Sequence, residues 1–179
     1  MRRIVVTSFL SLDGVVENPA WTFPYWNDEI AQFKGEETEA SDALLLGRVT
    51  YQGFAAAWPD SPDEGAPYFN NVRKYVVSNT LERAEWNNSV LIRGDVIAEI
   101  ARLKQGDGKG ITVHGSATLV QALMQHDLVD CYRLLVYPVV LGTGRRLFHE
   151  GSSATLRLVQ TRSFSSGVAA LIYEPARSG

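Results

Sequence analysis

The sequence predicts a single α/β domain with one mixed, mostly parallel central sheet, helices on both faces and an antiparallel hairpin at the C-terminal edge. Three observations lead to this fold class. The first two-thirds of the chain alternate β-branched runs with stretches of helical periodicity. The last third holds β runs around the turn signal Ser165-Ser166-Gly167. The length of 179 residues, with 45% hydrophobic and 21% charged residues, is typical of one domain spanning 1–179.

The first predicted element is a strand over Arg3–Phe9, where an isoleucine and two valines run together. The following Asp13-Gly14 is a turn signal. The stretch 18–26 contains two prolines and four aromatic residues. Because prolines exclude regular structure and aromatic side chains require burial, we expect a packed loop that walls a ligand site. The alternative is that this loop only caps the core.

A helix is predicted over Asp28–Ser41, with Ile30, Phe33 and Thr38 on one face and two acids in its first turn, where the helix dipole favours them. A short apolar strand over Ala43–Leu46 follows. A helix over Val49–Ala57 is expected to turn Val49, Phe54 and Ala57 toward the core, and the stretch 60–67, rich in proline, glycine and aspartate, is predicted to be a loop.

The same signals place the remaining elements. Strands are predicted over 74–78, 89–92 and 111–114, and helices over 96–104 and 116–125. A turn with three glycines, 105–110, separates the first of these helices from the strand that follows it. The last third is predicted to be antiparallel β structure over 130–140, 155–163 and 168–174.

Composition and charge exclude several classes of function. The net charge of −3, from 17 basic and 20 acidic residues, argues against a nucleic-acid binder. No apolar run approaches the roughly 20 residues of a membrane helix, and the N-terminus lacks the apolar core of a signal peptide, so we expect a cytoplasmic protein. Cys131 is the only cysteine and the three histidines are scattered. We therefore expect a buried Cys131, no internal disulfide and no metal site.

Three segments at the predicted carboxyl ends of strands are candidate anion sites, because ligands of open α/β sheets bind at that edge. Gly47-Arg48-Val49-Thr50 opens a helix whose free N–H groups attract phosphate, and Arg48 adds a charge. Gly115-Ser116-Ala117-Thr118 repeats this arrangement. Ser78-Asn79-Thr80 offers short polar donors just past a strand. The alternatives are two ordinary capped helices and a simple turn.

Four segments carry a resemblance to a known family: Ser11–Gly14, Leu45–Tyr51, Val113–Ser116 and Tyr137–Gly144. In this order and spacing, the chain resembles the dihydrofolate reductase-like superfamily. Within it, the chain is most similar to the reductase (RibD C-terminal) domain of bacterial riboflavin biosynthesis and its stand-alone relatives. The resemblance spans nearly the whole chain. It implies a dihydrofolate reductase-like fold and an NADPH-dependent reductase.

The resemblance also implies which residues bind NADPH. The helix start at Gly47, Arg48 and Thr50 would bind the phosphates of the cofactor. Ser78, Asn79 and Thr80 would hold its 2′-phosphate side. The turn at Gly115 and Ser116, continued by Ala117 and Thr118, would lie under the pyrophosphate.

Substrate and catalytic residues are expected around the end of the first strand. The resemblance places Ser8 and the loop of Asp13 and Val15 near the nicotinamide and the substrate. Asp13 either orients the substrate or merely makes the turn. We expect the loop at 18–26, with Trp21 and Trp26, to form the substrate wall.

Two further residues are candidates for proton chemistry. The resemblance places Glu29, or in second place Asp28, at the position of the carboxylate that anchors the pterin in dihydrofolate reductases. The alternative is that these acids only interact with the helix dipole. Tyr137 is a candidate proton donor, besides a substrate hydroxyl or a bound water.

The expected function is hydride transfer from NADPH to a small heterocyclic or imine/carbonyl substrate, as in 5-amino-6-(5-phosphoribosylamino)uracil reductase. The expected assembly is a homodimer, with neither nucleic acid nor membrane as a partner. Dihydrofolate reductase is one alternative. A non-catalytic nucleotide-binding or regulatory protein of the same fold is the alternative from another class, because a fold does not fix a function.

Overall fold

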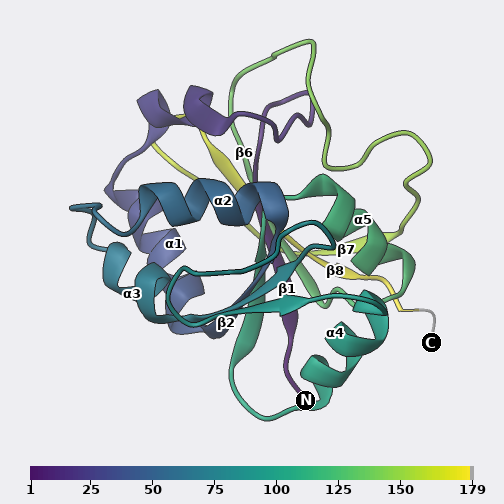
Figure 1. The fold of residues 1–179 in the computed structure, drawn as a ribbon. Coiled ribbons are helices and arrows are strands. Elements are labelled where there is room, and N and C mark those ends of the chain that lie inside the picture. The colour runs from purple at the N-terminus through teal and green to yellow at the C-terminus, as the bar shows by residue number, and fades with distance from the viewer. Residues whose placement is uncertain (178–179) are drawn as a thin grey trace.

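A computed structural model describes residues 1–177 and contains one eight-stranded sheet (Figure 1). The strand order is β4-β3-β2-β5-β1-β6-β8-β7. The strands are β1 (Ile4–Leu10), β2 (Ser41–Gly47), β3 (Arg73–Val77), β4 (Ser89–Ile92), β5 (Gly110–His114), β6 (Cys131–Val136), β7 (Leu156–Ser163) and β8 (Ala169–Pro175). Strands β1 to β6 are parallel to one another, whereas β8 runs antiparallel to both β6 and β7. The predicted fold class is confirmed.

Helices cover both faces of the sheet (Figure 1). They are α1 (Asp28–Glu39), α2 (Arg48–Ala57), α3 (Ala66–Asn71), α4 (Val96–Gln105) and α5 (Ala117–Gln125), with a 3-10 helix η1 (Pro19–Tyr25) before them. Alternate residues of a strand face opposite ways. Leu44 and Leu46 of β2 accordingly pack with α2 and α3, while Leu45 packs with α4 and α5. Helix α1 packs on the same face as α2 and α3.

The pairing of β1 with its two neighbours determines where its carboxyl end lacks one of them. Strand β1 pairs with β5 only up to Thr7, opposite His114, but it pairs with β6 as far as Leu10, opposite Val136. Strand β5 therefore ends beside Thr7, and the last three residues of β1 continue without it. They lie at the edge where the carboxyl ends of the parallel strands meet. This is the edge at which ligands of such sheets bind.

The stretch 18–26 differs from its prediction in two ways. It forms the 3-10 helix η1, because Pro19 stands in its first turn, where no N–H bond is needed, and Pro24 has a φ that suits a helix. The aromatic side chains are also less buried than expected. Phe23 is 74% exposed and Trp26 is 47% exposed. Trp21 and Tyr25 are half-buried.

The region after β2 brings three more corrections. Val49 and Ala57 are exposed, and Tyr51 is the buried residue of α2. The prediction of which side chains of this helix face the core was wrong, because the first turn of α2 lies beyond the edge of the sheet. Residues 66 and 67, predicted as loop, begin the short helix α3, since a proline in the first turn is compatible with a helix. Strand β6 ends at Val136, before Pro138.

Two expectations about buried and membrane-spanning segments can be compared with the structure. Cys131 is buried, as predicted. Among residues 1–177, no helix combines the length and the apolar character needed to cross a bilayer.

Candidate active site

Two glycine turns lie against each other at the carboxyl edge of the sheet, where β2 and β5 are neighbours. A Cβ atom on Gly47 would lie 2.7 Å from Ser116 Oγ, and one on Gly115 would lie 2.9 Å from Thr50 Oγ1. Gly115 and Ser116 both have left-handed backbone conformations, with φ of 58° and 50°. Glycine at both positions therefore lets the two predicted phosphate turns approach each other this closely, and this pair of turns is called the cradle below.

The two helix starts at this cradle differ in how their N–H groups are satisfied. No side chain caps α2, which follows Gly47. Ser116 caps α5 by accepting a hydrogen bond from the N–H of Leu119, at 3.3 Å. Arg48 is exposed and donates to Gln52 Oε1 at 3.1 Å. Within residues 1–177, the start of α2 therefore combines N–H groups that no side chain caps with a guanidinium whose one side-chain partner, Gln52, is neutral, and this combination favours an anion.

The segment Ser78–Thr80 lies next to the start of α2, because Val77 pairs with Gly47. Ser78 Oγ accepts hydrogen bonds from the N–H groups of Thr80 and Leu81, at 3.2 and 3.0 Å. Ser78 thus makes the turn itself. Asn79 and Thr80 are exposed and can contact a ligand held by Arg48.

The start of α5 receives an arginine that the sequence reasoning missed. Ala117 is buried, but Thr118 is exposed, and Arg145 Nη2 donates to Thr118 Oγ1. The backbone N–H of Arg145 donates to Glu17 Oε2 at 3.0 Å. The signal that could have revealed it is the pair of arginines directly after Gly142-Thr143-Gly144.

Asp13 joins two loops. Its carboxylate accepts hydrogen bonds from Ser11 Oγ (2.6 Å) and from the N–H groups of Leu141 (3.1 Å) and Gly142 (2.8 Å). These bonds, that from Ser11 first, lower the pKa of Asp13 to about 2. Asp13 is therefore ionised at neutral pH and holds no proton to donate. Val15, in the same loop, is 1% exposed and pairs with Arg146.

Glu29 and Tyr137 are placed differently from each other. Glu29 Oε1 accepts hydrogen bonds from the N–H (3.1 Å) and Oγ of Ser165, which lower its pKa and tie α1 to the β7–β8 hairpin. Tyr137 is fully buried in edge-on contact with Phe9, Trp21 and Tyr25. Its hydroxyl has no hydrogen-bond partner within residues 1–177, and burial raises its pKa to about 12. Trp26 packs edge-on against Phe9.

Ser8 lies one residue beyond the last β1–β5 pair. It is 6% exposed, and its Oγ has no hydrogen-bond partner in the described part of the chain. A buried hydroxyl without a partner is uncommon and calls for a ligand, a water or a strained site. On the neighbouring strand, His114 packs against Phe54 and Phe69. Burial and the charge of Lys34 hold the pKa of His114 well below its usual range, so it is neutral.

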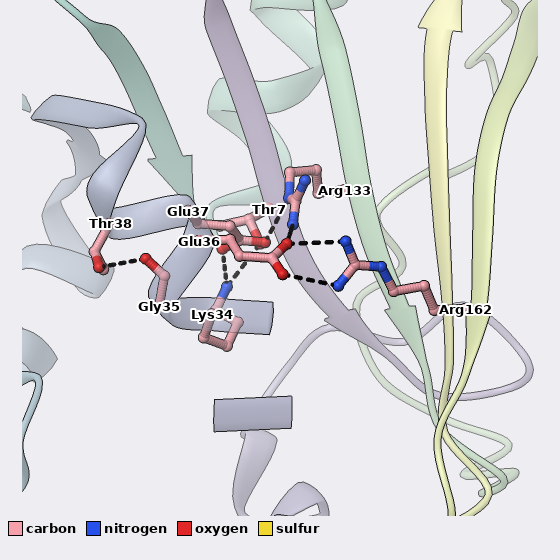
Figure 2. A network of polar contacts seen from close by, with 8 residues as sticks. All are labelled: Thr7, Lys34, Gly35, Glu36, Glu37, Thr38, Arg133 and Arg162. Atoms are coloured by element: carbon pink, nitrogen blue, oxygen red, sulfur yellow. Dashed lines mark hydrogen bonds and ion pairs between the residues drawn. The ribbon is translucent and has the colours of Figure 1, made fainter. Parts of the chain in front are cut away.

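A second group of residues that sequence reasoning missed lies between α1 and the sheet. This charge cluster consists of Thr7, Lys34, Glu36, Glu37, Arg133 and Arg162 (Figure 2). Its members come from α1, β1, β6 and β7. The signal in the sequence was the helical spacing of Lys34 and Glu37 with Ile30 and Phe33, which puts all four side chains on the inward face of α1.

A metal centre finds no support in the residues that the structure describes, since none of them form a group of three or more His, Cys, Asp or Glu side chains that could hold an ion.

Relatives and solved structures resemble this chain over nearly its full length. Uncharacterized protein YyaP of Bacillus subtilis (strain 168) is 30% identical over 178 residues, which cover 96% of this chain and 94% of that protein. The crystal structure of a pyrimidine reductase-like protein from Corynebacterium diphtheriae superposes with a TM-score of 0.74 at 12% identity, covering 99% of this chain and 93% of that one.

A bifunctional protein from Thermotoga maritima shares the fold as well. It is a diaminohydroxyphosphoribosylaminopyrimidine deaminase/5-amino-6-(5-phosphoribosylamino)uracil reductase. Its TM-score is 0.71 at 16% identity, over 98% of this chain and 57% of that one. At these identities the two solved structures show the fold alone. The family model of the RibD C-terminal domain matches residues 2–170, and the chain therefore belongs to the RibD C-terminal domain family.

Proposed function

We propose that this chain is an NADPH-dependent reductase that transfers hydride to a small heterocyclic or imine/carbonyl substrate. The reaction would resemble the 5-amino-6-(5-phosphoribosylamino)uracil reductase activity named for the Thermotoga maritima protein. One observation carries the proposal. The facing turns at Gly47 and Gly115, at the starts of two helices, pack so closely that a Cβ on either glycine would clash with a side chain of the other turn. Such a cradle suits the pyrophosphate of a dinucleotide.

The residues around the cradle fit NADPH in charge and in donor type. Gly47, Thr50, Gly115 and Ser116 would lie along the pyrophosphate. Arg48, with Asn79 and Thr80 beside it, would hold the 2′-phosphate. The orphan hydroxyl of Ser8, where β1 and β5 part, would meet the nicotinamide end. When bound, the nicotinamide supplies the hydride, and the protein positions and shields it.

A uracil-type substrate is favoured over dihydrofolate by the contacts of Glu29. In the folate reductase alternative, Glu29 would anchor the pterin. Here, both the N–H and the hydroxyl of Ser165 donate to its carboxylate. Those bonds would have to break before Glu29 could hold a pterin. Proton donation by Asp13 is not part of the proposal, because the hydrogen bonds to that carboxylate keep it ionised.

The test is a titration of the purified protein with NADPH and, separately, with NADH, followed by nicotinamide fluorescence and thermal shift. NADPH at a hundredfold excess over Kd should stabilise the fold by about 2.7 kcal/mol. Arg48→Ala should weaken NADPH binding about tenfold or more and NADH binding much less, because a charged hydrogen bond to the 2′-phosphate is lost. Arg157→Ala, on the far edge strand β7, is the matched control. If neither nucleotide binds, the non-catalytic alternative takes its place.

A further inference from the structure

Lys74, the second residue of β3, is a fully buried lysine. Within residues 1–177, no carboxylate lies within ion-pair distance of its ammonium. Its Nζ donates instead to three backbone carbonyl oxygens, those of Asn70 at 3.4 Å, Val72 at 3.0 Å and Asn87 at 2.8 Å. Each of the three N–H groups of the ammonium therefore has an acceptor.

The ammonium of Lys74 also lies over the ring of Trp86, with Nζ 4.1 Å from the ring centre. The negative face of an indole ring attracts a cation in this position. Burial lowers the pKa of Lys74 to about 8, so the side chain still carries its proton at pH 7. Carbonyl oxygens and an aromatic face thus take the place of the carboxylate that pairs with the other buried lysine, Lys104.

The contacts of Lys74 join two separate segments of the chain. Asn70 and Val72 lie at the carboxyl end of α3, where a cation is favoured by the helix dipole. Asn87 belongs to the β3–β4 loop, which consists of residues 78–88. The same loop is bonded to Asn70 by Trp86 Nε1 at 3.0 Å and by Asn87 Nδ2 at 2.9 Å. Lys74 therefore fastens the end of the β3–β4 loop to α3.

The β3–β4 loop begins next to the cradle. Its first residues, 78–80, follow Val77, which pairs with Gly47 at the start of α2. Near its other end, the backbone N–H of Trp86 donates to the hydroxyl of Tyr51 at 3.0 Å, and the two rings lie 6.1 Å apart. Tyr51 is the buried residue of α2 and directly follows Thr50. Trp86 thus connects the ammonium of Lys74 to the helix that starts at the cradle.

We propose that Lys74 is a positioning residue for binding of the 2′-phosphate of NADPH. Because it is fully buried, it acts through the β3–β4 loop and not by touching the cofactor. Its ammonium fixes Trp86 and Asn87, and the fixed loop holds Asn79 and Thr80 beside Arg48. A loop without this anchor would have to be ordered during binding, and the lost conformational freedom opposes binding. This inference rests on the proposed function, since it names what holds the 2′-phosphate side of that site in place.

The test measures loop order and nucleotide preference separately. Lys74→Met keeps most of the aliphatic stem but removes the ammonium, so amide hydrogen exchange of residues 79–88 should become faster than in the wild type. The ratio of the Kd for NADH to the Kd for NADPH should fall about fivefold or more, because only NADPH carries the 2′-phosphate. A loss of stability alone affects both nucleotides alike and does not move this ratio.

Lys104→Met is the matched control. Lys104 is also a buried lysine, bonded to Asp130 and to the carbonyl of Leu128, but it lies on the opposite face of the sheet. Its replacement should leave both the exchange of residues 79–88 and the ratio of the two Kd values unchanged. If Lys74→Met does not fold, Lys74→Gln, which keeps N–H donors without the charge, replaces it, and both effects are expected in the same direction.

The possible outcomes separate this inference from the proposed function. Unchanged exchange of residues 79–88 in Lys74→Met overturns the anchoring role of Lys74. Faster exchange with an unchanged ratio of the Kd values overturns its role in binding the 2′-phosphate. Equal Kd values for both nucleotides in the wild type overturn this inference, but not a reductase that uses either nucleotide. If the wild type binds neither nucleotide, the reductase proposal fails and the positioning role fails with it, while the exchange data still decide whether Lys74 fastens the loop.

Discussion

The glycine cradle and the charge cluster occupy the same region of the sheet but are built in opposite ways. The cradle is made by two short turns that approach each other closely because both carry glycine, since any Cβ on Gly47 or Gly115 would meet a neighbouring side chain. The charge cluster is filled, with Glu37 bonded to residues of β1, α1 and β6. A site made of short glycine turns can be encoded by a few adjacent residues, whereas a buried polar cluster needs side chains from several elements of the fold.

The largest expected effect is on stability, from breaking the charge cluster. Glu37→Gln should destabilise the protein by about 3 kcal/mol, because it removes a buried carboxylate that the half-buried Lys34 and Arg133 share. The Kd for NADPH should change little if the cradle is independent of the cluster. Urea unfolding and an NADPH titration measure the two quantities. Glu39→Gln, exposed near the end of the same helix, should stay within about 0.5 kcal/mol of wild type.

The next effect is on binding, from filling the cradle. Gly47→Val should weaken NADPH binding about thirtyfold or more, since the new side chain occupies the space between the two turns. The cost in stability should be smaller than that of Glu37→Gln. Gly53→Ala is the control on the same helix α2, where an added Cβ meets nothing within 4 Å, and it should stabilise the protein by about 0.5–1 kcal/mol. Unchanged NADPH binding by Gly47→Val would show that the cofactor does not enter the cradle.

The smallest effect tests Asp13, which joins two loops beside the cradle. Its folded pKa, about 2, lies below the ordinary value of 3.8. The bonds to the carboxylate therefore stabilise the fold above pH 3.8, and this contribution is lost as the pH falls toward about 2. Asp13→Asn should melt below wild type at pH 7, and the difference should shrink at pH 3. A difference that does not depend on pH would mean that the charge of Asp13 plays no part.

The same contrast explains what the sequence could predict. The turns at Gly47 and Gly115 were visible because glycine, a helix start and a preceding strand are adjacent in the chain. The charge cluster could not be predicted from the sequence, because Lys34 bonds to Thr7, 27 residues away, and Arg133 lies 96 residues from Glu37. The inward helix face predicted from the sequence held Ile30, Phe33 and Thr38, and it did not include Lys34.

Most errors in the predicted helices come from how prolines were interpreted and from which side chains of a helix were expected to be buried. Pro19 and Pro67 were interpreted as breaks, yet each stands at the first or second position of a helix. Val49 was expected on the inward face of the predicted helix, together with Phe54 and Ala57. The helix there starts beyond the sheet edge, so the first inward side chain is that of Tyr51. Such errors shift an element by a few residues and leave the sheet order intact.

The strand order has a consequence for synthesis of the chain. Strand β1 emerges first from the ribosome, but its two neighbours are β5 and β6, which end at residues 114 and 136. At about 5–20 residues per second, the ribosome needs several seconds to supply them. During that time the apolar β1 has no sheet to join, whereas β2, β3 and β4 can already pair. The strand at the centre of the finished sheet is thus the first to be made, yet it has both of its neighbours only after residue 136, which makes β1 a segment that a chaperone would usefully hold.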